Sequence, residues 1–138
     1  MASFSDFQSA VYRALMAEPS VTAIVNTRIF DDVPHEKETP ATALPRISIG
    51  DQTGTEAGSD THDASEITIT LHAWSRSPGR SECLNMITAM IDALHKKDHA
   101  VADGVLVYLN YDAHETQKDP DGETYHGIVR FTGLMQFG

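Results

Sequence analysis

The residues best suited to chemistry in this sequence are its seven histidines, because imidazole binds metals and exchanges protons near neutral pH. His95 and His99 stand four positions apart, and two other histidines precede a carboxylate, in His35-Glu36 and His114-Glu115. A helical metalloprotease site requires His-Glu-x-x-His, with both imidazoles on one face of the helix. That motif is missing, and the two lysines between His95 and His99 would oppose a dication. We therefore expect no bound metal and no cofactor.

Other catalytic arrangements lack the residues that they require. Asp119-Pro120-Asp121-Gly122 resembles the start of a calcium loop, but the twelfth position, where a Glu should close the loop, is Arg130. Cys83 is the single cysteine, so no intrachain disulfide can form. It could act as a nucleophile with a distant histidine, but its position on an apolar helix face favours a small core residue. We expect a protein that is not an enzyme, with a histidine- or metal-dependent enzyme as an alternative.

A second group of side chains is suited to contacts with other proteins. Trp74 should point away from the helices, either as an interface anchor or as a cover for the sheet edge of its own subunit. His72 and His126 could meet as a pair for binding or as a pH-sensitive contact, or remain two half-exposed polar residues. The candidate subunit or partner interface comprises Trp74, Arg76, His72, Tyr108, His126, Ile128 and Arg130.

Two amphipathic helices should help to position these residues. The first is expected from Ser5 to Ala17, with Ser5 and Gln8 as a capping box, and a short helical turn follows from Ser20 to Val25. The second should open at Ser77-Pro78, with Ser77 as the N-cap. Its buried stripe is expected to contain Leu84, Ile87, Ile91 and Leu94, broadened by Met86 and Met90. Arg76 and Arg80 flank its start, where they could hold an anion or end in solvent.

Alternating apolar residues predict the strands. We expect strands at Arg28–Val33, Arg46–Gly50, Glu66–Trp74, Gly104–Glu115 and Glu123–Gln136. Pro34–Pro45 should be a surface loop, and the polar segment Asp51–Ala64 should be mobile. Asp119–Gly122 has the chemistry of a hairpin turn.

The inner and outer faces of the strands follow from the same alternation. The residues expected to face the helices are Ile47, Ile49, Ile67, Ile69, Leu71, Ala73, Val105, Val107, Leu109, Tyr111, Val129 and Phe131. On the opposite face, Leu106, Tyr108 and Ile128 should lie beside His126 and Arg130. This second face is too apolar to be left in water and too polar for a core. The pattern predicts a single α+β domain over residues 1–138, with a mainly antiparallel sheet and two longer helices on one face.

The composition narrows the classes of function. The chain has 138 residues and a formal charge of -10, with a sequence pI near 4.9. This charge disfavours a general nucleic-acid binder and attachment to anionic membranes. We find neither a secretory signal nor an apolar run of the ~18–20 residues that would span a bilayer. We expect a soluble intracellular protein.

Three stretches together resemble a family of small tail-completion proteins of tailed phages, prophages and gene transfer agents. They are Thr27–Pro34 leading to Leu44–Gly50, Ile67–Leu94 with its Leu-His-Ala-Trp-Ser-Arg segment, and Asp119–Gly127. The resemblance covers nearly the whole chain, and the Asp51–Ala64 segment carries none of the family's pattern.

This resemblance implies a fold like that of lambda-type tail terminators and a place at the head–tail junction of a virion or phage-like particle, after synthesis in the bacterial host cytoplasm. It implies a homo-oligomeric ring, expected to be a hexamer, that ends growth of the tail tube and joins it to the head. The partners would be other copies, the tail tube protein and a head-side connector or stopper, with DNA only passing through the lumen and no membrane. A small ligand-binding α+β module remains a further alternative.

Overall fold

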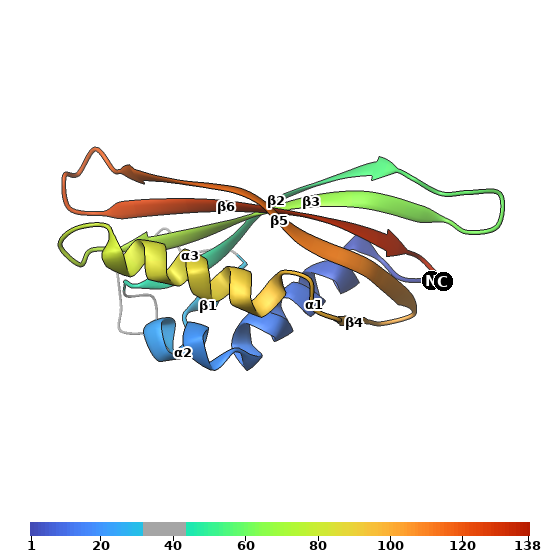
Figure 1. Ribbon diagram of the computed structural model, residues 1–138, viewed down its shortest axis with the longest axis horizontal. Coiled ribbons are helices and arrows are strands. Elements are labelled where there is room, and N and C mark those ends of the chain that lie inside the picture. Colours follow the sequence, from blue (N-terminus) through green and yellow to red (C-terminus); the bar gives the residue numbers. More distant parts are fainter. Residues whose placement is uncertain (32–43) are drawn as a thin grey trace.

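One twisted sheet, with all the helices on one of its faces, makes up the part of the chain that the computed structural model describes, residues 1–31 and 44–138 (Figure 1). The strand order is β1-β2-β3-β6-β5-β4, and only the β1–β2 pair is parallel. The elements are α1 (Phe4–Ala17), α2 (Pro19–Val25), β1 (Ile29–Phe30), β2 (Arg46–Glu56), β3 (Ala64–Ser75), α3 (Ser81–Leu94), β4 (Ala100–Val101), β5 (Gly104–Lys118) and β6 (Tyr125–Gln136). The predicted α+β class, with a mainly antiparallel sheet and two longer helices on one face, is confirmed.

The first helix has its predicted buried stripe but a different cap. Phe7 and Leu15 are fully buried. The capping box is formed by Ser3 and Asp6, so the prediction of Ser5 and Gln8 is wrong. The Ser3 hydroxyl accepts a hydrogen bond from the Asp6 backbone N–H at 3.1 Å, and the Asp6 carboxylate accepts one from the Ser3 N–H at 2.8 Å. An acidic side chain in the first turn also complements the helix dipole, which a glutamine does not.

The start of α3 differs from the prediction. Ser77 is not its N-cap, because Gly79 at φ +82° turns the chain first and the helix begins at Ser81. Instead the Ser75 hydroxyl accepts from the Ser77 backbone N–H at 3.2 Å and donates to Glu82 in the first turn at 2.7 Å.

The buried face of α3 is also rotated from the predicted stripe. Leu84 is 39% exposed, although we expected it to be buried, and Ile91 is only partly buried. The buried side chains are Cys83, Met86, Ile87, Ala89, Met90, Ala93 and Leu94. Small residues on this face let the helix lie close to the sheet. Cys83 is fully buried, which confirms its interpretation as a small core residue.

Strand β2 is much longer than predicted. The expectation that Asp51–Ala64 is mobile is wrong for its first part, because Gln52 to Glu56 pair with Ile69 to Ser65 of β3. Backbone pairing orders this polar segment. The sequence shows no sign of a strand here, because the mostly exposed side chains have no apolar alternation. The predicted strand Arg28–Val33 is reduced to Ile29–Phe30 within the described residues. Most of the predicted loop Pro34–Pro45, together with His35-Glu36, lies outside them.

A bulge changes which side chains of β5 are buried. The pairing with β6 shifts register between Leu106 and Tyr108. A bulge adds one residue to a strand and reverses the alternation beyond it. Because our prediction continued one alternation through this point, it assigned the residues before Tyr108 to the wrong faces. Val105 and Val107 are 55% and 48% exposed, although we expected them to be buried, and Leu106 is buried instead of facing outward. Leu109, beyond the bulge, is buried as predicted.

The central strands β3 and β6 pair along their full length, from Ala64 opposite Gln136 to Ser75 opposite Tyr125. Their inner residues are buried under the helices, as the alternation predicted; these are Ile67, Ile69, Leu71, Ala73, Val129 and Phe131. Gly127 lies close against α3. A Cβ added there would lie 2.8 Å from Cys83 Sγ and 2.9 Å from Ile87 Cδ1.

We predict that Gly127→Ala destabilises the fold by about 1–3 kcal/mol, the usual cost of overpacking a core. Urea unfolding would measure this loss. The double change Cys83→Ala and Ile87→Val removes the two atoms in the way, so in the Gly127→Ala background it should recover part of the stability. A Gly127→Ala protein as stable as the wild type would contradict close packing of α3 on β6.

Candidate functional site

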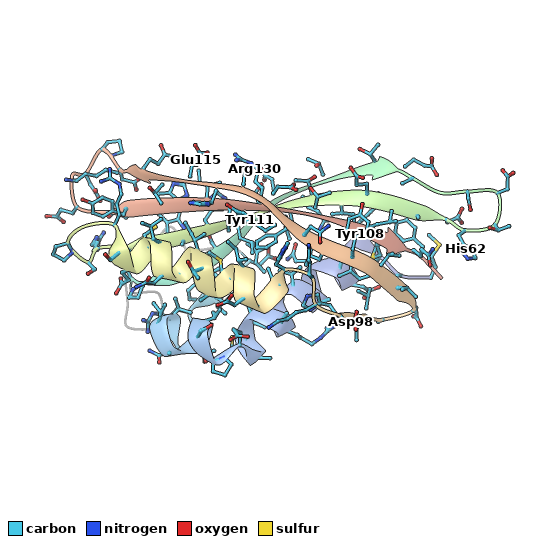
Figure 2. All side chains as sticks on the ribbon, in the orientation of Figure 1. His62, Asp98, Tyr108, Tyr111, Glu115 and Arg130 are labelled. Carbon is cyan, nitrogen blue, oxygen red and sulfur yellow. The ribbon has the colours of Figure 1, made fainter. Side chains whose placement is uncertain are left out.

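The face of the sheet opposite the helices has no helix over it in the described part of the chain (Figure 1). We call it the open face. Its main side chains are Ser48, Thr68, Thr70, His72, Trp74, Tyr108, Glu115, His126, Ile128, Arg130, Thr132 and Leu134. Figure 2 shows Glu115 and Arg130 on this side of the sheet. The structure therefore places six of the seven predicted interface residues on one face, with Arg76 at its end.

An aromatic cluster lies on the open face where β2, β3 and β6 run side by side. The register sets Trp74 opposite His126 and His72 opposite Ser48. The rings of Trp74 and His126 stack, with centroids 3.8 Å apart and planes 8° from parallel. His72 Nδ1 lies 2.7 Å from His126 Nε2, within hydrogen-bond distance. Of the two alternatives considered for these histidines, the structure therefore shows the pair.

The cluster is also tied to β2. The Trp74 indole Nε1–H donates to the Ser48 hydroxyl at 3.0 Å. A Cβ added at Gly50 would lie 2.5 Å from His72 Nε2, so the imidazole rests on this glycine. Sequence reasoning did not find Ser48 or Gly50. Alternation puts Ser48 on the outer face, but only the register shows which β3 residues it meets.

Burial favours the neutral form of this histidine pair. Partial burial of both rings is the main cause that lowers the pKa of His72 and that of His126 below the ordinary 6.5. The positive charge of Arg130 further lowers the pKa of His72, while Asp51 opposes this. For His126, the neighbouring His72 adds to the lowering, and Asp119 and Glu115 oppose it. A hydrogen bond between two ring nitrogens needs one unprotonated acceptor, which agrees with a neutral pair.

Beyond the cluster, the open face also carries polar contacts. Arg130 and Glu115 form an exposed ion pair at 3.6 Å (Figure 2), which contributes little stability in water. The Thr132 hydroxyl donates to the Asp112 carboxylate and lies 3.3 Å from the Thr68 hydroxyl. These contacts hold short polar side chains flat across the strands.

Arg76 directly follows β3 and reaches the turn between β5 and β6. Its Nε–H donates to the Thr124 hydroxyl at 3.2 Å. Hydrogen bonds from the hydroxyl and backbone of Thr124 lower the pKa of Asp121 to about 2, which stabilises the predicted Asp119–Gly122 turn. Arg80, the other arginine considered for anion binding, lies over the Tyr125 ring, 5.2 Å from its centroid.

His95, His99 and Cys83 are engaged in structural contacts. His95 Nδ1 accepts from the Tyr111 backbone N–H at 2.9 Å, and His99 Nε2 lies 3.0 Å from the Leu94 carbonyl oxygen. Burial raises the pKa of the Cys83 thiol to about 11, so the thiol stays protonated at neutral pH. Within residues 1–31 and 44–138, no three His, Cys, Asp or Glu side chains are grouped in a way that could hold a metal ion. No helix in these ranges is both long and apolar enough to cross a bilayer.

Comparison with known proteins gives a consistent result. The family model described as tail completion protein gp17 matches residues 9–136. A chain of the virion of a native gene transfer agent particle superposes with a TM-score of 0.83 and 22% identity, covering 94% of this chain and 93% of the other. The structure of the gp17 protein of bacteriophage SPP1 gives a TM-score of 0.60 and 21% identity, with 95% and 91% covered. No curated protein shows significant sequence similarity.

We predict that the fluorescence of Trp74, the single tryptophan, reports protonation of His126, because a charged imidazole quenches an indole stacked on it. On acidification the emission should fall with a midpoint below the ordinary 6.5, since burial lowers the pKa of His126. His126→Gln should remove this transition. A midpoint at or above 6.5 in the wild type would contradict a buried neutral pair.

The same shifts predict how stability depends on pH. Both histidines have a folded-state pKa below 6.5, so the unfolded chain binds protons first as the pH falls. The contribution of the two histidines to the free energy of unfolding should be constant well above pH 6.5. It should decrease as the pH falls through 6.5 towards their folded-state pKa values. Urea unfolding from about pH 8 to about pH 5.5, above the range of most carboxylates, tests this. The decrease should be smaller in His126→Gln; an equal slope would contradict the prediction.

Proposed function

The chain belongs to the tail completion protein gp17 family, a family of structural tail proteins of virions, and we propose that it works as one subunit of a ring at the head-proximal end of a tail tube. In this proposal the ring, expected to be a hexamer, ends growth of the tube and joins it to a head-side connector. The chain acts by binding other proteins and carries out no catalysis. The family match over residues 9–136 is the observation that carries this proposal.

The open face supplies a surface for such binding. Along the outward positions of β3 and β6 only Glu66 and Arg130 are charged, one of each sign, although the chain carries a formal charge of -10. Interface centres are depleted in charge and enriched in aromatic residues, as at Trp74. Such a face can contact another protein without the repulsion that a strongly acidic surface would cause.

The acidic remainder of the chain suits a pore for DNA. Like charges disfavour adhesion of phosphates to the wall, so a ring of acidic subunits would let DNA slide through without holding it. A ring structure with a strongly basic lumen would count against this part of the proposal. Nothing in the described residues favours the ligand-binding module or the histidine-dependent enzyme over the ring subunit.

We predict that the purified protein stops elongation of tubes assembled from the tube protein of the same particle. Negative-stain images should show shorter tubes with an annular density at one end. About tenfold or more of the Ile128→Lys protein should be needed to shorten the tubes equally, because this substitution places a charge in the middle of the open face.

Leu84→Lys is the matched control. It makes the same change of an aliphatic side chain to lysine, at a 39% exposed position on the helical side of the molecule, and should cap tubes like the wild type. Wild-type protein that leaves tube length unchanged would contradict the terminating role. If Ile128→Lys and Leu84→Lys changed the capping of tubes equally, a role for the open face would be contradicted.

A further inference from the structure

The two long outer strands of the sheet are each covered along only part of their outer edge. On β2, pairing with β1 is confined to Ile47 and Ser48. From Gly50 to Glu56, no backbone group of the described residues pairs with the edge that faces away from β3. This seven-residue segment is one strand of the β2–β3 hairpin, which extends beyond the helices at one end of the molecule (Figure 1).

The outer edge of β5 is covered in the same partial way. β4 pairs with Gly104 and Val105. Next, the Lys96 backbone N–H donates to the Leu109 carbonyl at 2.8 Å. The imidazole of His95 then accepts from the Tyr111 N–H at 2.9 Å. Beyond this point, from Ala113 to Lys118, the described chain offers the edge no backbone partner.

Uncovered strand edges are unusual at this length. Unpaired N–H and C=O groups are a template for another strand, so proteins usually shorten or block their edges. Here one part of each edge is blocked, and the open parts of β2 and β5 lie towards opposite ends of the sheet (Figure 1). Partly blocked and partly open edges of this kind are suited to pairing with a strand of another chain.

The strand directions indicate which partner fits. β2, β3, β6 and β5 are antiparallel in succession, so the outer strands β2 and β5 run in opposite directions. When neighbouring copies keep a similar strand orientation, the β5 edge of one copy meets the β2 edge of the next in the antiparallel sense. A contact between two different edges is heterologous and can close into a ring.

We propose that the open β2 edge, Gly50–Glu56, of one copy pairs with the open β5 edge, Ala113–Lys118, of the next copy, so that one antiparallel sheet continues from subunit to subunit. This inference rests on the proposed ring and names the contact that builds it. The segments are of similar length, seven and six residues. Antiparallel alignment brings the Asp51 end of one segment to the Lys118 end of the other.

Hydrogen exchange of the ring tests the pairing whatever its register. In rings formed at high concentration or on tube ends, the amides of Gly50–Glu56 and Ala113–Lys118 that point away from β3 and β6 should exchange at least tenfold more slowly than in the isolated subunit. The hairpin loop at residues 57–63 is an internal control and should keep its rate. If no ring forms, both the ring and the strand pairing are overturned. Rings in which the two edges exchange as fast as in the subunit overturn only the pairing.

Thiol cross-linking tests which edges meet. Thr53→Cys and Gln117→Cys place one thiol in each open segment on the open face, since Thr53 pairs with Thr68 and Gln117 with His126, while native Cys83 is fully buried. A short bis-maleimide, which tolerates an offset of a residue or two, should join the double variant into covalent chains up to the full ring. Each single variant should stay monomeric on a denaturing gel. Dimers of either single variant would show like edges meeting and overturn the proposal, and so would linkage of either edge to the tube protein alone.

Discussion

The pairing of β3 with β6 is the interaction on which the rest of the structure depends. These strands run antiparallel from Ala64 opposite Gln136 to Ser75 opposite Tyr125, and they carry the core on one face and the proposed binding surface on the other. Side chains alternate between the faces of a strand, so a single register both buries Leu71 and Phe131 under the helices and brings His72, Trp74 and His126 together outside. A slip of one residue would exchange the two faces.

The packing of α3 depends on the same pairing. Gly127 leaves room for Cys83 and Ile87 against β6, and on the other face its neighbour His126 stacks on Trp74. Core and cluster therefore share a backbone segment. The partial burial of two neutral imidazoles, whose pKa values fall for that reason, means that the cluster is a preformed and largely uncharged surface. Rigid aromatic side chains lose little entropy when a partner covers them.

The open face and the open edges are complementary features of a subunit that is built to be covered. A monomer in water would gain little from a half-apolar face or from two strand edges with unpaired backbone. A tail protein that assembles gains from both, because the edges can extend the sheet sideways while the face remains available to a different protein. Like-charged acidic subunits can approach one another at these places because most of their charge lies elsewhere.

Much of this was determined by the sequence alone. Local alternation and periodicity identified the two longer helices, the strand Glu66–Trp74, the Asp119–Gly122 turn and the outer positions of His72, Trp74 and His126. The sequence did not reveal the bulge that buries Leu106 and exposes Val107, the rotation of α3 that exposes Leu84, or the ordering of Asp51 to Glu56. These were decided by tertiary structure, because backbone pairing and helix–sheet contacts join residues far apart in the chain. Alternation tells which face a side chain takes, but only the register of the paired strands determines which side chain it meets.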